Sequence, residues 1–203
     1  MGSPETDVQF MTPLLFATNN QYKVDEMRLA VGHLVQVLSL KEAGIQVDIP
    51  EPFDTLEENA REKAQAIHTL TGLSCFSEDT GLEVYSLNNE PGVQSARYAG
   101  DGRSSDDNIA KLLDKLKGKT DRRGRFRTVI SLIWRGKEHQ FEGICEGEII
   151  EQKRGTLGFG YDPVFTPAGS TLTFAEMAIE EKNRFSHRKK AADQLVLFLQ
   201  VER

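Results

Sequence analysis

The hydrophobic pattern at the start of the chain predicts a strand, a helix and a second strand. Apolar residues 14–18 form a short run that ends at Asn19, which is typical of a buried strand followed by a turn. Apolar positions within 24–31 recur at steps of three and four residues, as on one face of a helix. A second apolar run covers 34–40. Strand, helix and strand in this order favour a parallel β-α-β unit.

The next part of the chain predicts a long helix followed by two short strands. Residues 56–70 carry one apolar stripe at helical spacing, and we expect Gly72 to end this helix. The apolar segments 75–77 and 82–87 predict two strands, with Glu78–Gly81 as a turn between them. The polar residues of this turn would then project from the end of a buried strand.

The second half of the chain predicts a meander between two further helices. Apolar positions at helical spacing predict a helix over 106–116. The last helix is expected to begin at Ser186, a favourable N-cap residue, and to continue through 199. Between them, apolar segments predict consecutive antiparallel strands over 126–134, 139–145 and 148–152.

Together these elements predict a mixed α/β domain. We expect residues 13–203 to form a single domain and the polar residues 1–12 to be a disordered lead-in. A cleft between the β-α-β unit and the meander would be the natural place for a ligand.

Composition narrows the class of protein. The chain has 203 residues, of which 38% are hydrophobic and 28% charged, as expected for a globular domain. The formal net charge of -6 argues against nucleic acid as a partner, and the chain has no apolar run long enough to span a membrane. Cys75 and Cys145 lie in apolar segments without metal-binding spacing, so we expect buried thiols in a reducing cytoplasm.

The segment Thr18-Asn19-Asn20-Gln21-Tyr22-Lys23 is a candidate phosphate site. It follows a predicted strand and opens a helix, whose first N–H groups are unpaired and partly positive. Lys23 adds a full positive charge. The same residues also fit an ordinary turn with a capping Asn and a solvated Lys.

Acidic residues provide candidate metal ligands. Asp79 lies in the predicted turn after a buried strand, and Glu51 is a candidate second ligand from another loop. Mg²⁺ prefers hard oxygen ligands and keeps several of its waters, so two carboxylates near a cleft suit it. The alternative is that Asp79-Thr80-Gly81 is simply a favourable turn.

The segment Gly155–Pro163 is a candidate base pocket. Its glycines allow the backbone to approach a ligand closely. Phe159 and Tyr161 offer flat faces for stacking, and Asp162 is able to accept a hydrogen bond from a base N–H. A Gly-rich hairpin loop with its aromatic residues in the core is the alternative.

A basic cluster lies around the start of the last helix. It contains Lys182, His187 and Arg188, and the helix dipole disfavours cations at this end. A bound anion would relieve that conflict. Arg188 offers paired donors for the O6/N7 edge of a purine. A solvated basic face is the alternative.

Six motifs, taken in order, resemble the inosine triphosphate pyrophosphatase family, which removes non-standard purine nucleotides (ITP, dITP and XTP) from the precursor pool. The resemblance covers about 14–199. The motifs are Thr18-Asn19-Asn20-x-x-Lys23, Glu57-Glu58-Asn59-Ala60, Glu78-Asp79-Thr80-Gly81-Leu82, Pro91-Gly92-x-x-Ser95-Ala96-Arg97-Tyr98, Gly158-Phe159-Gly160-Tyr161-Asp162-Pro163 and Ser186-His187-Arg188.

The resemblance implies an elongated α/β fold, two lobes around a central nucleotide-binding cleft, a homodimer and Mg²⁺ as cofactor. It implies that Glu51 and Asp79 bind the metal and that Asp79 also accepts the proton. Glu78 stands where many relatives have Asp. The implied substrate-binding residues are Thr18, Asn19, Asn20, Lys23, Thr80, Phe159, Gly160, Tyr161, Asp162, Lys182, His187 and Arg188.

The implied reaction converts a nucleoside triphosphate and water into the monophosphate and pyrophosphate, with water attacking the α-phosphorus. Arg188 or His187 would donate to O6 of hypoxanthine or xanthine, and Asp162 would accept from N1–H. Lys182 would lie at the pocket rim or nearer the triphosphate. Alternatives are a pyrophosphatase for other modified nucleotides, a non-catalytic nucleotide sensor and an RNA-binding module, the last disfavoured by the acidic charge.

Overall fold

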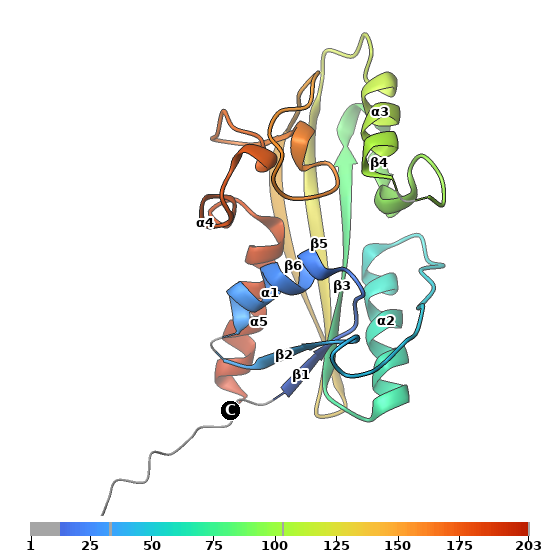
Figure 1. The fold of residues 1–203 in the computed structure, drawn as a ribbon, viewed down its shortest axis with the longest axis vertical. Helices are drawn as coiled ribbons and strands as arrows, with labels where there is room; N and C mark the ends of the chain where they lie inside the picture. Colours follow the sequence, from blue (N-terminus) through green and yellow to red (C-terminus); the bar gives the residue numbers. More distant parts are fainter. Residues whose placement is uncertain (1–12, 33, 103, 203) are drawn as a thin grey trace, which may run out of the picture.

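The polypeptide forms one mixed sheet whose long central strands run along the longest axis of the molecule (Figure 1). The structure is a computed structural model that describes residues 13–32, 34–102 and 104–202, so the lead-in predicted for 1–12 lies outside it. The strand order is β2-β1-β3-β5-β6-β7, and β4 pairs with β3. The strands are β1 (Pro13–Phe16), β2 (Gln36–Ser39), β3 (Cys75–Val84), β4 (Glu90–Gly92), β5 (Arg123–Trp134), β6 (Lys137–Ile149) and β7 (Phe165–Pro167).

Four of the five described α-helices lie where apolar spacing predicts them, and the short helix α4 was not predicted. Their bounds are α1 (Gln21–Val31), α2 (Leu56–Thr71), α3 (Ser105–Lys115), α4 (Ile179–Lys182) and α5 (His187–Val201). Gly72 ends α2 in the left-handed conformation, and Ser186 caps α5 by accepting from the N–H of Lys189. Within the described residues no helix is both long and apolar enough to cross a membrane.

The part of the sheet that contains β1 and β2 is covered by helices on both faces. Successive side chains of a strand point to opposite faces, so Phe76 packs with α1 and α5 while Cys75 packs with α2. The parallel β1–β2 pair confirms the predicted β-α-β unit. This part of the molecule forms the first lobe.

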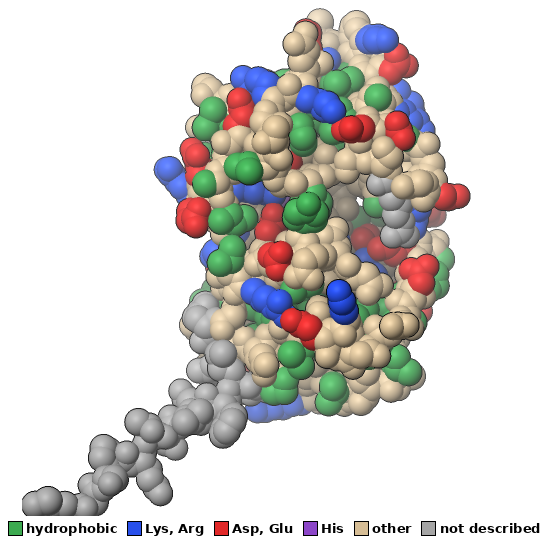
Figure 2. All heavy atoms as spheres, in the orientation of Figure 1, with side chains coloured by type: hydrophobic (Ala, Val, Ile, Leu, Met, Phe, Trp, Pro, Cys, Tyr) green, Lys and Arg blue, Asp and Glu red, His purple; other side chains and the backbone are tan. Residues whose placement is uncertain are grey.

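The far ends of the long strands carry a second hydrophobic core. Leu82, Phe126 and Phe165 pack there with α3 and with the segment that precedes α4. The two cores lie along the strands of one sheet, and the surface is hollowed between them (Figure 2). The expected elongated α/β fold with two lobes is therefore confirmed.

Three predictions of strand boundaries were wrong. Glu78–Gly81 is not a turn, because β3 continues through it and pairs residue by residue with β5. Backbone pairing on a long strand outweighs the turn preference of Asp, Thr and Gly. The segment 82–87 is strand only to Val84, and a 3₁₀ turn, Tyr85–Leu87, follows. Residues 148–152 are not a separate strand, since β6 runs to Ile149 and the third antiparallel strand is β7.

Candidate functional site

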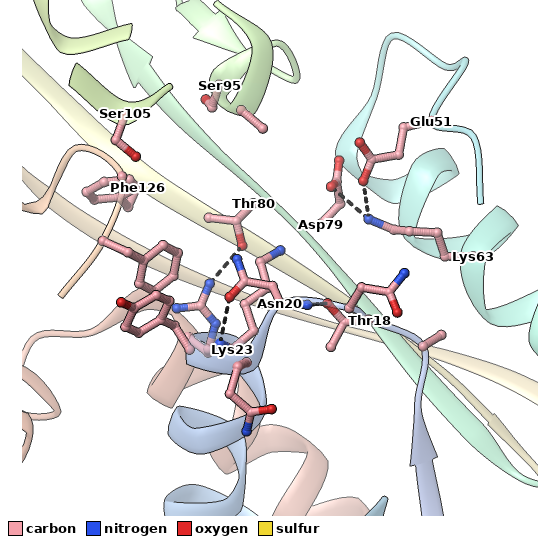
Figure 3. Close-up of a pocket in the computed structure, with 18 of the residues that line it drawn as sticks. Thr18, Asn20, Lys23, Glu51, Lys63, Asp79, Thr80, Ser95, Ser105 and Phe126 are labelled. Carbon is pink, nitrogen blue, oxygen red and sulfur yellow. Dashed lines mark hydrogen bonds and ion pairs between the residues drawn. The ribbon is translucent and has the colours of Figure 1, made fainter. Parts of the chain in front are cut away.

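The candidate site lies where one edge of β3 has no strand partner. On that edge β1 pairs only with Cys75 and Phe76, and β4 begins to pair at Leu82. Asp79 and Thr80, which lie on β3 between these contacts, line a cavity of about 590 Å³. Its other walls come from the β1–α1 loop, the loop before α2, the loop after β6 and the start of α5 (Figure 3).

Glu78 joins two cations within the protein. Its side chain is fully buried and accepts bonds from the Arg188 guanidinium at 2.8–3.0 Å, and it lies 3.1 Å from the Lys23 ammonium. Burial favours the neutral acid, but the two cations outweigh burial and hold the pKa of Glu78 well below its ordinary value. Glu78 is therefore a charged anchor for one residue of α1 and one of α5.

A second set of buried acids holds the remaining cations near the base-pocket loop. Glu26 on α1 binds both Arg188 and, at 2.9 Å, Lys182. The Lys182 ammonium also lies 2.7 Å from Asp162. Glu26, Glu78 and Asp162 thus relieve the helix-dipole conflict within the protein, so a bound anion is not needed to explain the cluster.

The Asp162 carboxylate also shapes the Gly-rich loop. It accepts the N–H of Phe159 at 3.0 Å, and burial raises its pKa although Lys182 opposes the shift. A Cβ at Gly158 would lie 2.1 Å from an Asp162 oxygen, and the φ of +73° there is left-handed. Glycine at this position is therefore required for Asp162 to close the loop.

His187 lies deep in the cavity wall as a neutral ring. It stacks on Phe126 at a centroid distance of 4.6 Å, and its Nδ1 has no partner within the described part of the chain. Burial, together with the charges of Arg188 and Lys182, lowers its pKa well below the ordinary value. An unpaired buried nitrogen beside a cavity is suited to hydrogen bonding with a ligand.

The start of α1 opens onto the same cavity. Asn20 caps the helix by accepting from the N–H of Lys23, and the Thr18 hydroxyl accepts from the N–H of Asn20. This geometry presents helical N–H groups and the Lys23 ammonium to the cavity, as a phosphate site requires. The Asn19 side chain instead donates to the carbonyl of Val47.

Glu51 and Asp79 converge on one ammonium group at the other side of β3. The Nζ of Lys63 lies 2.7 Å from Glu51 and 3.0 Å from Asp79 (Figure 3). Burial raises the pKa of Asp79 against the opposing charge of Lys63. Burial would also raise the pKa of Glu51, but Lys63 outweighs burial there and lowers it. Arg97 makes a further contact with Glu51 at 3.4 Å.

This pair of carboxylates fits a magnesium ion. Two hard oxygen donors already meet at one cation, and Mg²⁺ commonly takes one or two carboxylates and completes its shell with water and substrate phosphate. The loop that carries Glu51 is held by Asn59, whose side-chain amide binds both the N–H and the carbonyl of Phe53. The described residues contain no cluster of three or more protein ligands, so substrate oxygens would have to complete the shell.

All the residues predicted for the site line this one cavity. Some of their side chains are already engaged within the protein. The Tyr161 hydroxyl donates to the carbonyl of Ser95 at 2.9 Å, and the Thr80 hydroxyl is 2.6 Å from that of Thr128. Gly160 has left-handed backbone geometry, with φ of +61°.

Three residues that sequence reasoning missed also matter here. Lys63 lies on the apolar stripe of α2, three residues after Ala60, and a lysine in that position is a signal of a buried charge. Glu26 has no comparable signal, because its partners come from distant segments. Tyr22 was given no role of its own within the segment Thr18–Lys23, yet its ring stacks on Phe159 at a centroid distance of 5.4 Å.

Comparison with known proteins identifies the family. The model of the Ham1 family matches residues 14–198, which is most of the chain. The chain belongs to the Ham1 family. A relative from Christiangramia forsetii, named dITP/XTP pyrophosphatase, is 49% identical over 186 residues, which cover 92% of this chain and 98% of the relative. A Staphylococcus aureus relative of the same name is 39% identical and covers 95% of this chain and 99% of the relative.

Solved structures of Ham1 proteins share the fold. The Staphylococcus aureus Ham1 protein superposes with a TM-score of 0.85 at 38% identity, covering 95% of this chain and all of that one. A HAM1 protein from Coxiella burnetii has a TM-score of 0.86 at 36% identity, covering 94% of this chain and all of that one. The resemblance drawn from the six sequence motifs is therefore confirmed at the level of family and fold.

Proposed function

We propose that this chain is a nucleoside triphosphate diphosphatase that converts non-standard purine nucleotides (ITP, dITP and XTP) into the monophosphate and pyrophosphate. Relatives at 39–50% identity carry the name dITP/XTP pyrophosphatase. The observation that carries the proposal is that two converging carboxylates, Glu51 and Asp79, share one cavity with the Arg188–His187 pair. A hydrolytic centre and a base-reading centre therefore face the same ligand.

Glu51 and Asp79 would hold Mg²⁺, which supplies charge neutralisation on phosphate oxygens and acidifies a bound water. Lys23 and the first N–H groups of α1 bind the triphosphate, with Thr18 and Asn20 adding neutral hydrogen bonds. Lys63 also lines the cavity, and with the two carboxylates engaged by the metal it would be a further cation near the phosphates. Catalysis then consists mainly of positioning and electrostatic stabilisation.

Asp79 is the proposed proton acceptor. A water oxygen attacks the α-phosphorus, the bond between that phosphorus and the bridging oxygen to the β-phosphate breaks, and its electron pair leaves on pyrophosphate. The water proton passes to Asp79. The Asp79 carboxylate lines the cavity and is therefore placed to accept that proton.

Base selection is assigned to the other side of the cavity. Arg188 and His187 donate to O6, and Asp162 accepts from N1–H. Adenine presents the opposite groups at both positions, so it would leave buried donors and an acceptor unpaired. Phe159 supplies a stacking face, while Tyr161 and Gly160 shape the pocket from behind.

The decisive experiment measures pyrophosphate and phosphate release, with Mg²⁺, from ITP, dITP, XTP, ATP, GTP, dUTP and methylated nucleotides. We expect pyrophosphate from the first three at rates well above the others. Equal rates with ATP would contradict base selection. Binding of ITP without any release would favour the sensor, and preference for dUTP or methylated nucleotides would favour a different pyrophosphatase.

The assembly and compartment form a further part of the proposal. We propose that residues 13–203 work as one domain in a homodimer, in a reducing cytoplasm. Cys75 and Cys145 are buried and form no disulfide, which suits a reducing compartment. Light scattering on the purified protein tests the dimer, since a monomer mass at micromolar concentration would contradict it.

A further inference from the structure

Tyr22 is a large aromatic residue in an unusual place. It lies in the first turn of α1, directly before Lys23, and 59% of it is exposed. Within the described residues its hydroxyl forms no hydrogen bond. Its recorded side-chain contact is the stack on Phe159, with ring centroids 5.4 Å apart and planes 17° apart.

This stack connects the two halves of the site. Tyr22 belongs to the helix that presents phosphate-binding groups, and Phe159 belongs to the loop that carries Asp162. Both rings line the cavity. The Phe159 ring also has Lys182 and Arg188 within 5.4 and 5.5 Å of its centroid, so it lies beside the cations of the proposed base site.

We propose that Tyr22 is the second aromatic wall of the base subsite, so that the purine stacks between Phe159 and Tyr22. The inference rests on the proposed function, because it assumes a purine nucleotide in this cavity. Successive bases in a nucleic-acid strand lie about 3.4 Å apart, so rings on either side of a purine lie about 7 Å apart. Tyr22 must therefore swing outward on binding, and it is free to do so because it is exposed and lacks a hydrogen bond.

The exchange of stacking partners favours the bound state. The free protein loses one contact between two single rings, whereas the complex gains a purine face on each ring. A purine stacks more strongly on an aromatic side chain than two benzenoid rings stack on each other. Removing Tyr22 is therefore expected to weaken binding of the nucleotide by about fivefold without touching the bond that is hydrolysed.

The kinetic test compares Tyr22→Ala, Tyr22→Leu and Tyr22→Phe with the wild-type protein, using ITP and Mg²⁺. We expect the KM for ITP to rise about fivefold in Tyr22→Ala and nearly as much in Tyr22→Leu, with kcat within about twofold of wild type. Tyr22→Phe should match the wild type, because the hydroxyl has no partner. Leu29→Ala is the control, since Leu29 is a similarly exposed residue of α1.

A spectroscopic test detects the contact directly. Tyr22→Trp places an indole at this position, and we expect saturating ITP during turnover to quench its emission while pyrophosphate does not. The wild-type protein, whose Trp134 is buried outside the cavity, is the control. An unchanged KM in Tyr22→Ala, equal effects of Tyr22→Leu and Tyr22→Phe, or no quenching by ITP would each overturn the inference. If the wild type released no pyrophosphate from ITP, the proposed function itself would fail, which is a distinguishable result.

Discussion

Glu78 and Asp79 are adjacent in β3, yet their carboxylates lie on opposite faces of the sheet. Glu78 binds Arg188 of α5, whereas Asp79 binds Lys63 of α2. The alternation of side chains along a strand separates them, so one acid serves the base-recognition half and the other serves the hydrolytic half. The predictions below test this division.

Asp79→Asn is expected to lower kcat for ITP by at least about 100-fold, because the amide is a poor proton acceptor and a weaker metal ligand. Pyrophosphate release measures the effect, and circular dichroism checks that the variant folds. Asp121→Asn is the control, since the partner of Asp121 in the described part of the chain is the exposed Arg123. Activity of Asp79→Asn within a few-fold of wild type would refute its catalytic role.

Glu78→Gln is expected mainly to lower the free energy of unfolding. It leaves the buried Arg188 guanidinium with Glu26 as its remaining anion, and breaking a buried ion pair costs about 3–5 kcal/mol. Glu83→Gln is the matched control on the same strand, because its partner Arg125 is partly exposed and such pairs contribute about 0–1 kcal/mol. Urea unfolding compares the two, and equal losses would show that Glu78 is not a structural anchor.

Glu51→Gln is expected to raise the Mg²⁺ concentration for half-maximal activity by about tenfold or more, since one of two carboxylate ligands loses its charge. A Mg²⁺ titration at saturating ITP measures the shift. Asp54→Asn serves as control, because Asp54 is an exposed residue of the same loop. An unchanged Mg²⁺ requirement in Glu51→Gln would remove Glu51 from the metal site.

His187 makes stability depend on pH. Its folded-state pKa lies well below the ordinary value of 6.5, so folding disfavours its protonation. The contribution of neutral His187 to the free energy of unfolding is therefore fully present above about pH 6.5. It falls as pH decreases below that value, by up to about 1.4 kcal/mol per pH unit. His187→Phe, which keeps the stack on Phe126, should flatten this slope between about pH 6.5 and 5. Identical slopes in urea unfolding would contradict a buried neutral imidazole.

Gly143→Ala is expected to separate α5 from the sheet. An added Cβ would lie 2.0 Å from the His187 carbonyl oxygen and 2.5 Å from the Ala191 nitrogen. Such overpacking costs about 1–3 kcal/mol, and the displaced helix start should also lower ITP hydrolysis. Gly102→Ala is the control, since its Cβ would meet no atom within 4 Å. Wild-type melting temperature in Gly143→Ala would show that the helix has room to give.

Hydrophobic spacing located the four long helices and most strands because these elements bury one regular face. It failed at Glu78–Gly81, where polar residues typical of a turn lie inside a strand. Local preference cannot reveal that β5 pairs with this segment, since β5 lies far away in the sequence. The same limit applies to Glu26, whose partners Lys182 and Arg188 meet it only after the chain has folded.

Most of the site residues were predicted as a set because six motifs occur in family order, whereas Glu51 and Lys182 lie outside these motifs. Their engagement within the protein was not predicted. Arg188 and Lys182 were expected to await a ligand, but each is already held by two acids. Motifs report residue types, whereas the pairing of buried charges depends on burial and distance.

Because β3 is unbroken, the spacing between Glu78 and Asp79 is fixed. The anchor of the base-reading arginine and the proposed water-activating carboxylate are consecutive residues of one strand that is paired along its length with β5. Neither can shift along the substrate without the other. The proposed site would therefore select a nucleotide by size as well as by base, since only a nucleoside whose sugar spans this constant separation places its α-phosphorus at Asp79.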